Sequence, residues 1–222
     1  MTKLLVLVHT VPPLLGVFDR LCSETLPGVR RMHILDEPLL ERVRQRGRLA
    51  PEDSERMLAH VALAQQTGAD AVLVTCSTVS PCVDDVRPHV GIPVVKIDEA
   101  MVEQAVEAGR RIGVVATNAT TLEPTRRMLQ LQAERTGKSV QVQLVLVEGA
   151  LPALLSGDGA THDRMVKAAV LGLMPQVDVV VLAQATMARM LDVLPPQDRQ
   201  VPVLSSPHVA LALTGQLLDL GH

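Results

Sequence analysis

Aromatic side chains are almost absent from this sequence. Its 222 residues include one phenylalanine, Phe18, and neither tyrosine nor tryptophan. Without aromatic rings the chain has nothing on which to stack nucleic acid bases and nothing to form a cage around a quaternary ammonium group. The hydrophobic core must therefore be built from aliphatic side chains.

An excess of positive charge is also missing. The formal net charge is -3, from 21 Lys and Arg against 24 Asp and Glu. Binding to phosphates needs a basic surface, so nucleic acid is not an expected partner. No apolar run approaches the about 18 residues that suggest a membrane-spanning helix, so no membrane partner is expected. The short apolar run at residues 3–8 is interpreted as a β-strand and not as a signal peptide.

Cysteine is scarce and irregularly spaced. The chain has Cys22, Cys76 and Cys82, with no CxxC pair. An odd number of cysteines argues against a disulfide framework and is typical of a reducing compartment, so we expect a cytoplasmic protein. The seven histidines are scattered and no HExxH motif occurs, so the sequence supports no metal site.

Short β-branched runs alternate with longer helical stretches. Continuous apolar runs such as "AVLV" and "VVVL" are typical of parallel strands that are buried on both faces. The alternation predicts an α/β fold with parallel sheets. Strands are expected at residues 3–8, 32–35, 71–75, 93–96, 112–116, 140–147, 178–183 and 201–204.

Several helices between these strands have recognisable first turns. Pro51 followed by two acidic residues predicts a helix start, and Gly68 predicts its end. Further helix starts are expected at Ser80-Pro81 and Ser206-Pro207, with Asp98 and Thr161 as N-caps of two other helices.

A repeat organises the whole chain. The phrase "DAVLVTCSTV" begins at Asp70, and "DVVVLAQATM" begins at Asp178, 108 positions later. "IPVVKID" aligns with "VPVLSSP" at an offset of 109, and Thr10 aligns with Thr117 at an offset of 107. Chance similarity between apolar strands is the alternative, but Asp, Thr and Pro match as well as Val. The repeat therefore predicts two similar halves, at 1–98 and 99–222, with the C-terminal helix able to pack on the first half.

The repeated phrases end in polar residues at the place where parallel sheets bind ligands, beyond the carboxyl ends of their strands. If the halves face each other, Cys76 and Gln184 lie across one cleft. Short hydroxyls and helix N-termini beside them would hold a carboxylate, although ordinary helix capping uses the same residue types. The candidate substrate-binding residues are His9, Thr10, Ser77, Thr78, Thr117, Asn118, Thr120, Gln184 and Thr186.

At these motifs the sequence resembles the aspartate/glutamate/hydantoin racemase superfamily. "VTCST" at 74–78 is similar to the cysteine motif of the family's first half, and "LAQATMA" at 182–188 is similar to that of the second half. Gln184 stands where the second half normally carries a cysteine. "VVATNATT" at 114–121 resembles the Thr-x-x-Thr motif that opens the second half. The resemblance implies two α/β halves with four-stranded parallel sheets, related by a pseudo-twofold axis, with the active site between them. It also implies a homodimer or higher homo-oligomer and no cofactor.

The resemblance further implies a chemistry. Racemases of this family move the proton next to a carboxylate with one cysteine on each face of the substrate, and the superfamily includes arylmalonate decarboxylase and maleate isomerase. A glutamine amide exchanges no proton near neutral pH but forms hydrogen bonds with carboxylates and oxyanions. We therefore predict an isomerase or lyase that acts on a small carboxylic acid with Cys76 as the single catalytic cysteine, and not a two-base amino-acid racemase. The alternative is a non-catalytic protein that binds a small carboxylate.

Other polar residues are lesser candidates. Cys22 and Cys82 are expected to be packing residues, because free cysteine is commonly buried. His208 at a helix start, and Asp36 and Glu37 after a strand, are weaker candidates for the cleft; a solvated helix is the expected structure of residues 34–48.

Overall fold

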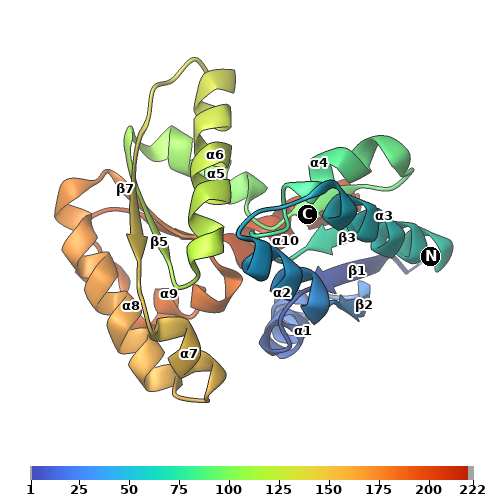
Figure 1. Ribbon diagram of the computed structural model, residues 1–222, viewed down its shortest axis with the longest axis horizontal. Coiled ribbons are helices and arrows are strands. Elements are labelled where there is room, and N and C mark those ends of the chain that lie inside the picture. Colours follow the sequence, from blue (N-terminus) through green and yellow to red (C-terminus); the bar gives the residue numbers. More distant parts are fainter. Residues whose placement is uncertain (1, 220–222) are drawn as a thin grey trace. The chain divides into compact units, whose positions relative to one another are not determined.

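The computed structural model describes residues 2–219. The chain forms two compact units (Figure 1). The first unit contains the chain up to Asp98 and from Pro207 onward, and the second contains Glu99–Ser206. Each unit has one four-stranded parallel sheet, so the predicted α/β fold with parallel sheets is confirmed.

The sheet of the first unit has the strand order β2-β1-β3-β4. Its strands are β1 (Leu4–His9), β2 (Arg30–Leu35), β3 (Ala71–Val74) and β4 (Val94–Lys96). Its helices are α1 (Pro13–Thr25), α2 (Glu37–Arg46), α3 (Pro51–Gln66), α4 (Cys82–Val86), the 3-10 helix η1 (Arg87–His89) and, from Pro207 onward, α10 (Ser206–Leu217).

The sheet of the second unit has the strand order β6-β5-β7-β8. Its strands are β5 (Arg111–Ala116), β6 (Gln141–Leu146), β7 (Val179–Leu182) and β8 (Val203–Ser205). Its helices are α5 (Glu99–Ala108), α6 (Ala119–Arg135), α7 (Ala150–Leu155), α8 (Gly159–Leu173) and α9 (Met190–Val193), with the 3-10 helices η2 (Met174–Gln176), η3 (Ala185–Met187) and η4 (Pro196–Asp198).

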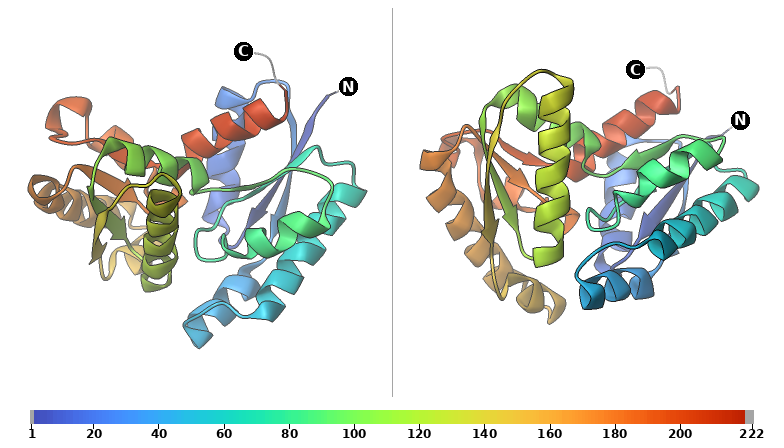
Figure 2. Two further views of the ribbon diagram at one scale, coloured as in Figure 1. Left: turned by 90° about the horizontal axis from the view of Figure 1, so that it is seen from above. Right: turned by 45° about the horizontal axis from the view of Figure 1, so that its top comes forward.

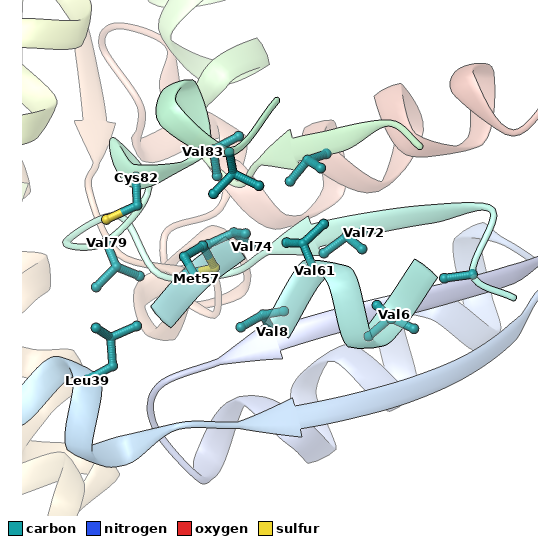
Figure 3. Packing of buried hydrophobic residues seen from close by; sticks show 14 of the residues in the cluster. Val6, Val8, Leu39, Met57, Val61, Val72, Val74, Val79, Cys82 and Val83 are labelled. Atoms are coloured by element: carbon teal, nitrogen blue, oxygen red, sulfur yellow. The ribbon is translucent and has the colours of Figure 1, made fainter. Parts of the chain in front are cut away.

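Aliphatic side chains fill both units. In the first unit, Val6 and Val74 of the sheet pack with Met57 and Val61 of α3, which are completely buried (Figure 3). Cys82 of α4 lies in the same cluster and is 1% exposed. In the second unit one cluster joins the sheet to α5 and α6, and another joins it to α8 and α9, so helices cover both faces (Figure 2).

All eight strands predicted from the sequence are confirmed, and their ends differ from the predicted ones by no more than two residues. Every residue of Ala71–Val74 and of Val179–Leu182 is buried, as expected for central strands of a parallel sheet that is covered on both faces. The continuous apolar runs were therefore a sound basis for the fold class. Within residues 2–219 no helix combines the length and the apolar character needed to cross a membrane.

The helix start predicted at Pro51 is confirmed, because α3 begins there. The helix predicted at Ser206-Pro207 also begins at Ser206. At Ser80-Pro81 a turn comes first, and α4 begins at Cys82.

The N-cap predicted at Thr161 is wrong. Helix α8 begins at Gly159, and its N-cap is Asp158, whose Oδ1 accepts a hydrogen bond from the N–H of Thr161 at 3.0 Å. A carboxylate at this position satisfies an N–H of the first turn, which leaves Thr161 inside the helix.

The two units repeat one topology, and a pair of aspartates shows the equivalence. Asp70 precedes β3, and its Oδ2 accepts the N–H of Leu4 at the start of β1 at 2.8 Å. Asp178 precedes β7, and its Oδ2 accepts the N–H of Arg111 at the start of β5, also at 2.8 Å. In both units, the aspartate before the third strand holds the start of the first strand. The matching Asp residues of the sequence repeat are therefore structural.

Candidate active site

Cys76 follows β3 at the carboxyl end of the first sheet and is half-buried. Its carbonyl oxygen accepts hydrogen bonds from the N–H groups of Val79, at 3.2 Å, and Ser80, at 2.9 Å, which form a turn before α4. Cys22 and Cys82 are no more than 2% exposed, and burial raises the pKa of each thiol to about 11. Cys76 is therefore the most accessible of the three thiols.

A buried carboxyl group holds the Cys76 turn. Asp98 follows β4 and is completely buried, and its Oδ1 accepts a hydrogen bond from the Ser80 hydroxyl at 2.8 Å. Burial raises the pKa of the Asp98 carboxyl, while the hydroxyls of Ser80 and Ser77 oppose that shift. Asp98 is the residue before α5, where an N-cap was predicted, and that role stays a prediction.

Three of the predicted hydroxyl residues lie at this edge of the first sheet. Thr10 follows β1, and Ser77 and Thr78 follow Cys76. All three are no more than 5% exposed. Within residues 2–219, the hydroxyl of Thr10 has no hydrogen-bond partner. A buried hydroxyl without a partner is unusual in a folded protein, and it marks a place where a ligand oxygen would gain a hydrogen bond.

His9 ends β1 and takes part in a buried chain of hydrogen bonds. The Thr75 hydroxyl donates to the carbonyl oxygen of Val8 at 3.0 Å, so it accepts from Nδ1–H of His9, at 2.8 Å. Nε2 of His9 is then the acceptor for Nδ1–H of His33, at 2.8 Å. Burial, with the neighbouring His33, lowers the pKa of His9 to about 3. His9 is thus a neutral residue with both ring nitrogens occupied, and a contact between it and a substrate stays a prediction.

The hydrogen bonds of Asp36 stabilise the first unit. It is the N-cap of α2, where its Oδ1 accepts the N–H of Leu39 at 3.1 Å. Both of its oxygens accept hydrogen bonds from the guanidinium group of Arg56, and Oδ2 lies 2.6 Å from Nε2 of His60. These partners are all within the first unit, and Glu37 is the first residue of the helix that Asp36 caps.

Gln184 follows β7 in the second unit, at the position that corresponds to Cys76 in the repeat. Its Oε1 accepts three hydrogen bonds, from the N–H of Thr117 at 2.5 Å, from the Thr117 hydroxyl at 3.0 Å and from the N–H of Asn118 at 3.1 Å. The two candidates Thr117 and Asn118 are therefore brought together with Gln184, at the start of α6.

The other candidates of the second unit lie in the same two loops. Asn118 is the N-cap of α6, and its side chain accepts the N–H of Thr120 at 3.4 Å. Thr186 lies in η3, and its hydroxyl is buried without a partner among residues 2–219. The hydroxyls of Ser205, which ends β8, and of Ser206, which follows it, are also buried without a partner among residues 2–219. Unsatisfied hydroxyls thus occur at the carboxyl edges of both sheets.

The predicted facing of Cys76 and Gln184 joins residues of different units, and it stays a prediction. His208 is exposed near the start of α10. Among residues 2–219, no three His, Cys, Asp or Glu side chains come together as a metal site would require.

Sequence reasoning missed a cluster of polar side chains in the second unit, in which His162 and Asp163 are buried and Arg189 is exposed. His162 is completely buried and its Nδ1 lies 2.9 Å from Oδ1 of Asp163, whose Oδ2 pairs with Arg189 at 2.8 Å. Arg189 directly follows "LAQATMA", which was the available signal. His33 was also missed, because it carries no motif and its role depends on the register of β2 beside β1.

Known proteins resemble this chain in sequence and in fold. A family model described as Asp/Glu/Hydantoin racemase matches residues 14–214. A search of curated proteins finds no match. Among solved structures, a glutamate racemase from Bacillus anthracis has a TM-score of 0.74 and 17% identity, over 98% of this chain and 82% of that one.

Two further solved structures have similar scores. An allantoin racemase from Klebsiella pneumoniae has a TM-score of 0.75 and 17% identity, over 99% of this chain and 89% of that one. An aspartate racemase from Picrophilus torridus has a TM-score of 0.74 and 12% identity, over 98% and 94% of the two chains. At these identities the likeness establishes the fold.

Proposed function

Because this chain belongs to the Asp/Glu/hydantoin racemase family, we propose that it is a cofactor-independent isomerase or lyase that acts on a small carboxylic acid, with Cys76 as its single proton carrier. Membership of this family supports the general part of the proposal, a racemase-type enzyme. The specific part of the proposal, a single proton carrier, is supported by the presence of Gln184 at the position that corresponds to Cys76 in the repeat.

The observation that supports this proposal is the fixed amide at position 184. A racemase needs a proton carrier on each face of a planar carbanion. Gln184 replaces one carrier with a group that does not titrate, and three hydrogen bonds to its oxygen hold that group in place. Cys76, at the corresponding place in the first unit, is a half-buried thiol.

The chemistry follows from one thiol. In isomerisation, the Cys76 thiolate removes the proton next to the carboxylate, and the C–H electron pair moves into the carboxylate to give an enediolate. Protonation of the same carbon from the same face regenerates the substrate. Net isomerisation therefore requires that the S–H deliver its proton to another carbon of a delocalised carbanion.

In the lyase reaction, the bond to a second carboxylate breaks and CO2 leaves. The electron pair of that bond forms the enediolate, and the Cys76 thiol protonates it. Both reactions gain from donors that bind the enediolate oxygens. The hydroxyls of Thr10, Ser77 and Thr78 and the amide Nε2 of Gln184 are the proposed donors, on the prediction that Cys76 and Gln184 face one substrate.

The test is proton exchange in deuterated water, followed by ¹H NMR on a panel of small carboxylic acids. The expected result is deuterium on one face of a single product stereoisomer, with turnover abolished by Cys76→Ala and mostly retained by Cys22→Ala. Rapid racemisation of aspartate or glutamate by the unmodified protein would contradict the proposal.

The second candidate function is binding of a carboxylate without turnover. The unpartnered hydroxyl of Thr10 is compatible with it, because a ligand oxygen would satisfy that group in either case. A protein that binds a carboxylate but exchanges no proton, and whose affinity is unchanged in Cys76→Ala, would favour this second function.

A further inference from the structure

The loop before α6 contains three hydrogen-bond donors that converge on one point. They are the N–H groups of Thr117 and Asn118 and the hydroxyl of Thr117, and we call them the Thr117–Asn118 cradle. Gln184 Oε1 lies 2.5 to 3.1 Å from all three. Thr117 is 6% exposed, so these bonds are formed in a largely dry environment.

The orientation of the Gln184 amide is determined by these partners. A backbone N–H can only donate. An amide NH2 group placed against two such groups would also be a donor, so no hydrogen bond could form. The oxygen must therefore face the cradle. Nε2 points away from it, and among residues 2–219 no hydrogen bond from Nε2 is formed.

Two N–H groups at the start of a helix form a site for an anion, and α6 is a 17-residue helix whose N-terminus carries partial positive charge. Here the protein supplies the oxygen itself. A substrate carboxylate could enter the cradle only by displacing the Gln184 oxygen from three hydrogen bonds. The amide oxygen is neutral, so it fills the cradle without adding a charge.

The first unit provides the internal comparison. Thr10 corresponds to Thr117 in the repeat, and Cys76 corresponds to Gln184. A thiol on a single carbon does not reach as far as a glutamine amide. The Thr10 hydroxyl remains buried at 2% exposure with no partner among residues 2–219, whereas the Thr117 hydroxyl is occupied by Gln184. The threonine hydroxyl therefore lacks a partner in the first unit and is bonded to Gln184 in the second.

We propose that Gln184 is a specificity-determining residue whose amide oxygen permanently occupies the Thr117–Asn118 cradle, so that the second unit contacts a substrate through the N–H groups of Nε2 and excludes a carboxylate from the cradle. The protein then selects acids that place a carboxylate on the Thr10 side and a hydrogen-bond acceptor oxygen toward Gln184. The identity of the substrate groups rests on the proposed function, while the occupied cradle does not.

The experiment measures the cradle directly, in the full-length protein. Sodium sulfate and sodium acetate are titrated into ¹⁵N-labelled protein at constant ionic strength, and the amide signals of Thr117 and Asn118 are followed. In the unmodified protein these signals are expected to show no saturable shift. In Gln184→Ala the cradle is open, and both signals should shift with an affinity at least about tenfold higher, equivalent to about 1.4 kcal/mol.

Two controls keep the result interpretable. Gln184→Glu supplies a carboxylate oxygen of the same reach, so its cradle should stay closed to both anions. Gln143→Ala removes an exposed glutamine of β6 and should behave as the unmodified protein. The remaining amide signals report whether each variant is folded, and Gln184→Ser serves as a second opened variant.

Either of two outcomes overturns the inference. Saturable shifts in the unmodified protein equal to those of Gln184→Ala would mean that the cradle is already open. A folded Gln184→Ala and a folded Gln184→Ser without any shift would mean that the cradle binds no anion. Both readouts are independent of turnover, so a failed exchange assay would reject the proposed reaction and leave the occupied cradle standing.

Discussion

The Ser80 hydroxyl donates a hydrogen bond of 2.8 Å to Oδ1 of Asp98, and this bond connects the turn after Cys76 to the end of β4. It joins two segments at the carboxyl edge of the first sheet. We propose that Asp98 is a positioning residue, which holds Cys76 through this turn.

Asp98→Ala is expected to lower the free energy of unfolding by about 1–3 kcal/mol, because the Ser80 hydroxyl loses its buried partner. Asp98→Asn should cost less, since an amide oxygen still accepts that bond and burial favours a neutral group. Urea denaturation at pH 7 measures both. Equal losses in the two variants would show that Asp98 contributes as a charged carboxylate. A reduced alkylation rate of Cys76 in folded Asp98→Ala, but not in Asp98→Asn, would indicate the positioning role.

Iodoacetamide at pH 8 should modify Cys76 much faster than the other two thiols. Cys22 and Cys82 have pKa values raised to about 11 by burial, which leaves about one part in a thousand as thiolate at that pH. Peptide mass spectrometry at early times measures the three rates, and protein unfolded in urea is the control in which all three should react. Early modification of Cys22 or Cys82 in the native protein would contradict their burial.

His9 should make stability depend on pH between about 6.5 and about 3. The unfolded chain binds a proton at His9 below about pH 6.5, whereas the folded protein binds it only near pH 3. Stability therefore falls as the pH falls through this window, by up to about 1.4 kcal/mol per pH unit from this residue. The difference between unmodified protein and His9→Gln, measured by urea denaturation from pH 7 to pH 4, isolates the effect. A constant difference would mean that His9 titrates normally in the folded state.

The facing of Cys76 and Gln184 can be tested by chemical cross-linking. In a Gln184→Cys variant that also carries Cys22→Ala and Cys82→Ala, a bis-maleimide that spans about 10 Å should join the two remaining thiols, because one small substrate bridges such a distance. Tryptic mapping detects the linked peptides. A folded variant without the link would contradict the facing arrangement. The same substitution supplies a second proton carrier, so it should produce some racemisation.

The fold could be predicted because its signals are local. The central strands of both sheets are short apolar runs, and all eight strands were located to within two residues. The sequence repeat also corresponds to a repeat in the structure, since Asp70 and Asp178 bond to the starts of equivalent strands. The cap at Thr161 failed because Asp158, three residues earlier, competes for the same helix start with a stronger acceptor.

The contacts of the site could not be predicted, because they depend on residues that are far apart in the chain. The repeat identified Gln184 and Thr117 separately, but the bond between them spans 67 positions and depends on how β5 and β7 pair. Asp98 was expected to cap its own helix, and only the packing of β4 beside β3 brings it to Ser80. Residue types therefore predict a carboxylate site, while the register of the strands decides which donors lack a partner in the folded units.

The division of the chain into units has a consequence for biosynthesis. The first unit is interrupted, because its second segment, which contains most of α10, begins at Pro207, after all of Glu99–Ser206. The second unit is one uninterrupted segment. During synthesis from the N-terminus, the ribosome releases every residue of the second unit before the first unit has received α10. The unit whose synthesis starts later is thus the first to be complete, and the unit that carries Cys76 gains α10 only after the whole second unit has been synthesised.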